Sequence, residues 1–198
     1  MSDVGVFREA LTWNDFVTQV EALSQSVFEA CFDPEEHAEA VTRLAHQLDR
    51  SDPALIAAFD ELAADQWQPY VTQRMGWSAT CGVVLISLLP DCRVGLHDHP
   101  QQSGVILCCG GHVAIEAFDV LPDPPLRLQR CASVSLREGG ATHLTPAQGN
   151  VHRLFCPEAT RLVDVFTPPL TDELRAMGRR FSLGSELEAG VFAATALD

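Results

Sequence analysis

The sequence predicts a mainly β domain, a sandwich or barrel of short strands, with a helical segment in front of it. From Trp67 onward, short apolar or β-branched runs alternate with Gly, Pro and Asp turns, which is typical of such folds. Before that point apolar residues recur at helical spacing. With 198 residues, 46% of them hydrophobic, the chain is long enough for one well-buried core but too short for two full domains. We therefore expect a helical subdomain over 1–66, a β-barrel over 67–170, and a short helix with a tail over 171–198.

Three helices are expected in the first segment. The first lies within residues 12–30, where one helical face carries Phe16, Val20, Leu23 and Val27. The second begins at Asp33-Pro34, which supplies an N-cap and a proline at the first helical position, and runs to about Leu48. Ser51-Asp52-Pro53 repeats this start signal and predicts a third helix.

Ten strand-like runs follow. They cover residues 67–75, 79–89, 94–98, 103–109, 112–119, 126–131, 133–137, 142–145, 151–156 and 161–166. Gly110-Gly111 stands between VILCC and HVAIEAF as a two-residue hairpin signal, which predicts that these two strands pair directly. Pro168-Pro169 ends the last strand, because proline lacks the ladder donor. Residues 171–180 favour one short helix, and the last eighteen residues, FSLGSELEAGVFAATALD, are expected to be coil or a packed arm.

Composition excludes several classes of partner. The formal charge of −14 and the lack of a basic run argue against nucleic acid and anionic membranes. No apolar run approaches the roughly 18 to 20 residues that cross a bilayer, and MSDVGVFREALTWNDF lacks the features of a signal peptide. Seven cysteines without CxxC spacing fit buried, reduced thiols in a cytoplasmic protein. Cys108 and Cys109 are expected on opposite faces of one strand.

Three histidines form a candidate metal site. His97 and His99 stand two residues apart, so on an extended strand both rings point to the same face. His152 follows a Pro and Gly turn in PAQGNVH. Three such nitrogen ligands leave one side of a metal open for substrate and oxygen. Two alternatives stay open: polar strand ends without a metal, and a non-redox Zn, Ni or Mn ion, because three histidines alone do not select iron.

The two histidine segments resemble the two cupin motifs. The first is a glycine, HxH, an acid and a later glycine, and the second is PxGxxH; here they read Gly95, His97-Asp98-His99, Ser103, Gly110, and Pro146 through Gly149 to His152. Ser103 stands where most metal cupins carry a glutamate ligand. In this respect the chain resembles the thiol dioxygenase branch, which includes cysteine, mercaptopropionate, aminoethanethiol and plant N-terminal-cysteine dioxygenases. The resemblance covers roughly residues 67–170, through LHDHPQQSG, GNVH and LVDVFTPPL.

This resemblance implies a cupin barrel, a double-stranded β-helix or jelly roll, as a divergent member of the family. It implies ferrous iron, Fe(2+), held by His97, His99 and His152. The expected partners are a small thiol and O₂, which react to give a sulfinic acid, and the expected state is a monomer or homodimer. The competing hypotheses are a cupin oxidative enzyme that acts on another metabolite, and a non-catalytic metal-binding cupin.

The chain departs from the family around the last strand. The Ser, His and Tyr of the cysteine-type enzymes are replaced by Leu162, Asp164 and Phe166, and the tyrosine that follows the two prolines in the aminoethanethiol branch is replaced by Leu170. Gly104 replaces the cysteine that some members cross-link to tyrosine. Candidates to replace the missing phenol are Tyr70, His143, Gln101 and Gln102. Because Phe166 makes one wall drier, we expect weak activity on cysteine and a preference for a bulkier or less polar thiol.

Three further side chains are candidates for the site. Asp164 lies in an apolar strand, where an unpartnered carboxylate is costly. It is expected to hold a ligand histidine or a substrate amine, with a structural hydrogen bond as the alternative. Tyr70 and Arg74, in PYVTQRM, lie near the place where cysteine-type enzymes hold the substrate carboxylate. Arg74 is either such an anion clamp or a surface arginine. His112 and His143 are expected to be packing or rim residues.

Overall fold

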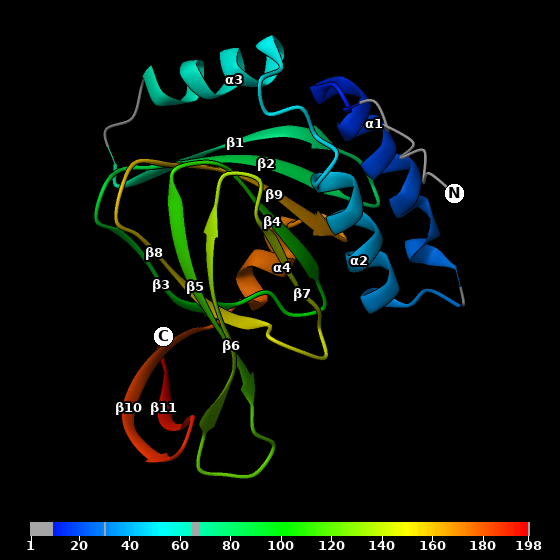
Figure 1. The fold of residues 1–198 in the computed structure, drawn as a ribbon. Coiled ribbons are helices and arrows are strands. Elements are labelled where there is room, and N and C mark those ends of the chain that lie inside the picture. Colours follow the sequence, from blue (N-terminus) through cyan, green and yellow to red (C-terminus); the bar gives the residue numbers. More distant parts are fainter. Residues whose placement is uncertain (1–9, 30, 65–67, 198) are drawn as a thin grey trace, which may run out of the picture.

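A computed structural model describes residues 10–29, 31–64 and 68–197 and shows helices packed beside a β-barrel (Figure 1). The described residues do not include residues 1–9, which belong to the segment tested for a signal peptide. They also do not include Trp67. The helices are α1 (Trp13–Ser24), the 3-10 turn η1 (Gln25–Phe28), α2 (Pro34–Ala45) and α3 (Pro53–Ala64). Asp33 caps α2 by accepting from the Glu35 amide at 2.8 Å, and Asp52 accepts from Ala54 at the start of α3 at 2.7 Å. None of the described helices has the length and apolar character needed to span a bilayer.

The strands form two antiparallel sheets. They are β1 (Tyr70–Trp77), β2 (Gly82–Leu88), β3 (Cys92–Asp98), β4 (Ser103–Gly110), β5 (His112–Val120), β6 (Arg127–Arg137), β7 (Ala141–Leu144), β8 (Val151–Cys156), β9 (Thr160–Thr167), β10 (Arg180–Glu188) and β11 (Val191–Leu197), with α4 (Asp172–Met177) between β9 and β10. One sheet has the order β1-β2-β9-β4-β7, and the other has the order β10-β11-β6-β5-β8-β3 and closes through β10 and β3. The facing sets β2-β9-β4-β7 and β3-β8-β5-β6 have the strand order of a jelly roll. The predicted cupin fold is therefore confirmed.

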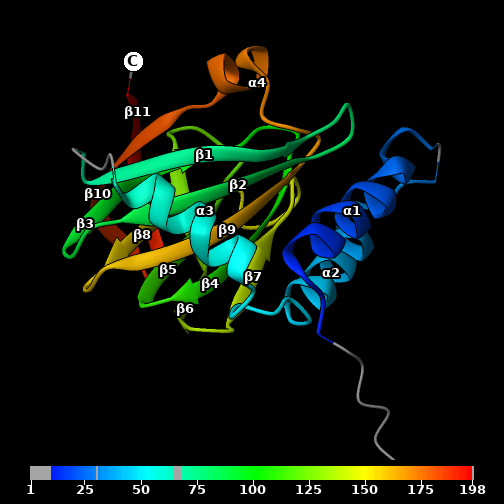
Figure 2. The same ribbon diagram turned by 90° about the horizontal axis from the view of Figure 1, so that it is seen from above.

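The helices cover the outer face of the first sheet. In Figure 2, α3 crosses above β1, β2 and β9, and α1 and α2 lie beside it. Apolar side chains at alternate positions of β2, β4 and β9 enter the helix-facing core: Val83, Leu85, Val105, Leu107, Val163 and Val165. Their neighbours Ile106 and Leu162 point the other way, into the barrel core. Both faces of β9 are buried, and its central residues, LVDVF, are apolar except for Asp164.

The predicted direct pairing across Gly110-Gly111 is wrong. β4 pairs with β7 and β9, whereas β5 pairs with β6 and β8, so the two glycines carry the chain from one sheet to the other. Gly111 has φ +81, and a Cβ there would collide with the carbonyl oxygen of Ala159. Close backbone approach at this crossover therefore requires a glycine at position 111, whereas a Cβ at Gly110 would meet no atom within 4 Å. The resulting Gly-Gly pair looks the same in the sequence as a tight hairpin turn.

The C-terminal residues, expected as coil or a packed arm, are not coil. β10 and β11 form a hairpin whose turn contains Gly190 (φ 78), and β11 pairs with β6. Most side chains of this hairpin are exposed, which explains the weak pattern, but Phe181 and Val191 are buried at 4% and 5% exposure. The backbone ladder and these few apolar anchors hold the hairpin. Residues 126–131 and 133–137, expected as two strands, form the single strand β6.

All seven cysteines are free, and four of them are buried. Cys31 and Cys131 are exposed, so the expectation that the cysteines are buried is wrong for these two. Cys108 belongs to the barrel core and Cys109 packs against the helix-facing core. Their predicted placement on opposite faces of one strand is confirmed.

An ion pair between the buried Asp98 and the half-exposed Arg179 fastens the C-terminal segment to β3. Asp98 lies between two histidines and, because side chains alternate along a strand, points to the opposite face. Its side chain is 3% exposed and accepts from the Arg179 backbone amide at 2.6 Å and from the guanidinium at 2.8 and 2.7 Å. The Asp98 amide donates to the Arg179 carbonyl at 3.0 Å. Both guanidinium contacts fall on Oδ2 and the amide contact on Oδ1. Hydrogen bonds to an ionised carboxylate are stronger than those between neutral groups.

We expect Asp98→Asn to loosen the C-terminal segment, because hydrogen bonds to a charged group contribute roughly 1.5 to 3 kcal/mol. Amide hydrogen exchange over residues 178–183 should then be at least about tenfold faster than in the unmodified protein. Glu138→Gln, in an exposed ion pair with Arg50, is the matched control. Unchanged exchange in the Asp98 variant would contradict this role.

Candidate metal centre

The three predicted histidines meet inside the barrel. His97 on β3 lies directly opposite His152 on β8, and side chains opposite each other in an antiparallel pair share a face. His99 follows two residues after His97, on the same side. The ring centroids are 4.5, 4.9 and 5.2 Å apart, and one nitrogen of each ring lies within 4.8 Å of the others. The fold thus gathers these nitrogens around one point, as metal binding requires.

All three rings are kept neutral, which is the form that binds metals. Burial lowers the pKa of His99 to about 3, and burial with the two neighbouring rings lowers the pKa of His152 well below its usual value. Burial also lowers the pKa of His97. The Nδ1 of His97 lies 2.8 Å from the Gly95 carbonyl oxygen, to which it donates, so Nε2 is the free ligand atom.

Within the described residues, no carboxylate completes the ligand set. Ser103, at the position of the usual glutamate, donates its hydroxyl to the Pro34 carbonyl at 3.5 Å and so points toward α2. The Nδ1 atom of His152 is buried without a hydrogen-bond partner. The electrostatics of the His152 ring nevertheless include a hydrogen bond to the Asn150 backbone, so a bound cation is inferred from the three rings together. Three neutral imidazoles that bring one nitrogen each within 4.8 Å of the others fit a bound cation.

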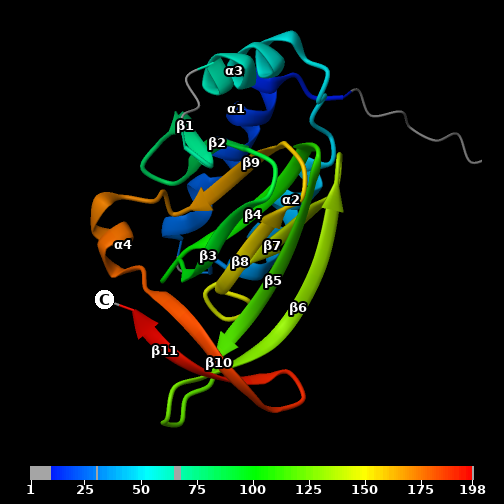
Figure 3. The same cartoon turned by 90° about the vertical axis from the view of Figure 1, so that its left-hand side faces the viewer.

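A cavity of about 360 Å³ extends from the histidines along the inner face of the first sheet. Its lining is mostly apolar and includes Val84, Ile86, Leu88, Ile106, Leu154 and Leu162. An outer depression of about 430 Å³ shares residues of this lining and is bordered by α4 and β10. Figure 3 shows α4 and the β10–β11 hairpin at this end of the barrel. The mouth of the cavity is therefore built by the C-terminal segment.

Asp164 is the one carboxyl group in the described cavity lining. It is opposite Val84 and Ile106 on the neighbouring strands. Burial raises its pKa to about 8, with a partial opposing effect from the Val165 amide, so the group is protonated at neutral pH. Its Oδ1 is buried without a hydrogen-bond partner. The predicted contact to a ligand histidine is thus not made by this atom, which is available to a substrate.

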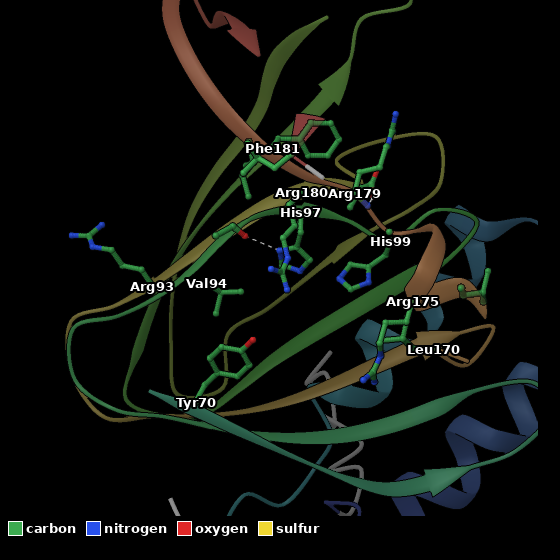
Figure 4. A pocket seen from close by; sticks show the side chains of 16 residues that line it. Tyr70, Arg93, Val94, His97, His99, Leu170, Arg175, Arg179, Arg180 and Phe181 are labelled. Carbon is green, nitrogen blue, oxygen red and sulfur yellow. Dashed lines mark hydrogen bonds and ion pairs between the residues drawn. The ribbon is translucent and has the colours of Figure 1, made fainter. Parts of the chain in front are cut away.

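Phe166, Tyr70 and Arg74 line the same cavity. The Phe166 ring centroid lies 5.0 Å from that of His99, so this wall is apolar next to the histidines. Tyr70 is 43% exposed at the mouth, where Figure 4 shows it projecting from β1. Arg74 lies over the Trp77 ring at 4.4 Å.

Of the four candidates to replace the missing phenol, Tyr70 alone lines the cavity. His143 contacts Glu35 on α2 at 2.9 Å, which makes it a link between helix and barrel. The Gln102 amide donates to the Pro168 carbonyl at 2.8 Å, and Gln101 borders a separate depression. His112 contacts Ser135 at 2.6 Å on the strand surface.

The structure adds two charged cavity residues that sequence reasoning missed. Arg175 on α4 and Arg180 on β10 line both the inner cavity and the outer depression. Arg180 is paired in register with His97. No signal in the sequence marks these arginines, because the pairing of β10 with β3 joins residues 83 positions apart in a segment with weak alternation.

No family model and no curated protein matches the chain. Among solved structures, it is similar to an RmlC-like cupin from Shewanella frigidimarina (20% identity, 55% of this chain and 85% of that chain, TM-score 0.44). It is also similar to KdgF from Halomonas sp. (13%, 57% and 93%, TM-score 0.42) and to an oxalate oxidase (12%, 52% and 53%, TM-score 0.42). Because these TM-scores are low, the fold assignment rests on the strand order, and the site assignment rests on the geometry of the histidines.

Removal of a ring should remove the metal. We expect the purified protein to carry about one equivalent of a transition metal, and His97→Ala and His152→Ala to lose it, because two nitrogens do not replace a facial set of three. Elemental analysis measures this directly. His46→Ala, which alters an exposed histidine bonded to the Gly139 carbonyl, should keep the metal. Unchanged metal content in both cluster variants would contradict the site.

The buried carboxyl group predicts a pH-dependent stability in the metal-free protein. The pKa of Asp164 is about 8 in the folded state and 3.8 as a free side chain. Between these values the unfolded chain releases a proton that the folded chain keeps, so this group lowers stability as the pH rises. The upper limit is about 1.36 kcal/mol per pH unit.

Asp164→Asn should therefore stabilise the metal-free protein more at pH 7.5 than at pH 5. Urea unfolding with a chelator present measures both variants, and the difference between them cancels the effects of the histidines. Asp60→Asn, in an ion pair with its side chain 61% exposed, is the control. Equal stabilisation at the two pH values would show that Asp164 is ionised in the fold.

Proposed function

We propose that this protein is a non-haem iron dioxygenase that oxidises a thiol to its sulfinic acid. The observation that carries the proposal is the set of three neutral histidines, without a carboxylate ligand, at the end of a mostly apolar cavity. A ferrous ion there would keep its full positive charge and so supply binding positions for a thiolate and for dioxygen. In the overall reaction, R–SH and O₂ give R–SO₂H, and both oxygen atoms go to sulfur.

The residues of the chain have separate tasks in this proposal. The Gly95 carbonyl fixes the tautomer of His97, so that Nε2 would be its ligand atom. Phe166 and Leu162 exclude water from the side of the sulfur. Asp164, protonated near neutral pH, donates a hydrogen bond into the cavity, as a neutral carboxylic acid in an apolar site can. It thereby takes the donor role that Phe166 and Leu170 lack.

Metal binding by a cupin barrel is the coarser function that the fold and the site support together. Iron rather than another metal, and a thiol rather than another reductant, belong to the proposal. The proposal also assigns the protein to the cytoplasm, where seven free cysteines stay reduced.

Oxygen uptake with a panel of cysteine, mercaptopropionate, cysteamine and larger thiols tests this function, with the sulfinic acid identified by mass spectrometry. We expect stoichiometric product and a larger or less polar thiol, rather than free cysteine, as the best substrate, because Phe166 makes the wall next to His99 apolar. Asp164→Asn should keep the fold and lower turnover at least about tenfold, whereas Asp60→Asn should not.

Two outcomes would count against the proposal. If the iron-loaded protein consumes no oxygen with any thiol, it is a metal-binding cupin of another kind. If free cysteine is the best substrate, the role given to Phe166 is wrong, although thiol oxidation stands.

A further inference from the structure

A smaller cavity, the side pocket, also reaches His152. It has a volume of about 40 Å³ and lies between strands β4 and β7 of one sheet and β5, β6 and β8 of the other. His152 and Ile106 line both the side pocket and the large cavity, so the two spaces meet at a histidine of the candidate metal site. The other apolar residues of its lining are Ile115, Ala117, Ala132, Val134 and Leu144.

The side pocket includes the place of a side chain that the sequence lacks. Gly104 is paired with Leu144 on β7 and with Phe166 on β9. It shares its face of β4 with Ile106, which points into the barrel. The nearest heavy atom to a Cβ at Gly104 would be Cγ of Leu144, at 3.4 Å. A position that could hold a side chain is therefore left open inside the barrel.

The walls of the side pocket offer little to a water molecule, which needs roughly two to four polar partners in a buried site. The ring of His143 contacts Thr42 at 3.4 Å and Glu35 at 2.9 Å on α2, so both its nitrogens are occupied there. Thr142 and His152 are the remaining polar side chains of the described lining, and His152 belongs to the histidine cluster. Cavities with apolar walls stay dry and bind small apolar molecules such as xenon.

The side pocket reaches the surface away from the mouth of the large cavity. Ala132 on β6 is exposed, whereas the other described residues of the lining are buried or half-buried. Figures 2 and 3 both place β6 and β7 on the side of the barrel away from α4, which borders the mouth. A ligand that fills the large cavity from its mouth therefore leaves this second opening free.

We propose that the side pocket binds dioxygen next to His152 and supplies it to the metal site while a thiol occupies the large cavity. Dioxygen is small, uncharged and apolar, so a dry apolar site favours it over water. The share of one water molecule in the liquid is roughly 30 Å³, so about 40 Å³ holds one molecule of this scale and excludes a larger thiol. The supply of oxygen to a reaction rests on the proposed function. The binding of oxygen depends only on the pocket.

Paramagnetic broadening by dissolved oxygen tests the binding site without turnover. NMR compares the methyl signals of the metal-free full chain under oxygen and under nitrogen. We expect the methyl groups of Ile115, Val134 and Leu144 to broaden at least about twice as much as those of Val20 and Leu55, because an apolar cavity concentrates a small apolar gas. Val20 and Leu55 are buried in the helix-facing core, outside the lining of the side pocket.

Two variants close the side pocket from opposite ends. Ala132→Phe places a ring over its outer end, and Gly104→Ala adds a methyl group inside, at an ordinary contact distance from Leu144. Each should remove the additional broadening. Ser133→Phe adds the same ring one residue later, on the opposite face of β6, and should keep it. Ala132 and Ser133 are both exposed, so both phenylalanine variants should fold.

Oxygen kinetics of the iron-loaded protein test the supply of oxygen to the reaction. At a saturating concentration of thiol, Ala132→Phe should raise the KM for oxygen at least about threefold, because the variant obstructs access and leaves the reacting groups unchanged. Its KM for the thiol, and its kcat at saturating oxygen, should equal those of the unmodified protein. Ser133→Phe should keep all three values.

The outcomes separate this inference from the proposed function. If no thiol is oxidised, but oxygen broadens the pocket methyl groups and Ala132→Phe removes the effect, the oxygen-binding site stands and the dioxygenase proposal fails. If thiols are oxidised, but the pocket methyl groups broaden no more than those of Val20, or Ala132→Phe leaves the KM for oxygen unchanged, the dioxygenase proposal stands and the role of the side pocket is overturned.

Discussion

The antiparallel pairing of β3 with β8 is the constraint on which the site depends. It sets His97 directly opposite His152, and the pleat then brings His99 to the same side while Asp98 points to the other. A shift of this register by one residue would move His152 away from its partner rings. The ladder of backbone hydrogen bonds that sets this register does not involve the imidazoles, and each ring keeps one nitrogen available to an ion.

The alternation of side chains along β3 also connects the histidine site to the C-terminal segment that borders the cavity. Inward residues of this strand supply imidazoles, and the outward Asp98 holds Arg179. The residue after Arg179 is back on the inner face, opposite His97. One face of β3 therefore carries the histidines, and the other face holds the segment that borders the cavity. A change at Asp98 would alter the position of that segment through the backbone.

Burial sets the charge of the groups at the base of the cavity. It keeps the histidines unprotonated and Asp164 protonated, so these protein groups carry little net charge. Arg175 and Arg180 are exposed and line the same cavity. Arg180 is paired in register with His97, so positive charge lies close to the neutral histidines in a chain of net charge −14.

The sequence alone determined the strand-rich barrel, the three helices and the histidine trio, because these depend on local alternation and on residue types with few other uses. The sequence also identified Asp164 as a candidate site residue, because burying a carboxyl group without a partner in an apolar strand costs free energy. Tertiary structure decided the rest. Gly110-Gly111 crosses between sheets rather than closing a hairpin, because the strands around it find better partners far along the chain. Arg175 and Arg180 come to the site because β10 pairs with β3. Residues so distant in sequence leave no local pattern from which this contact could be predicted.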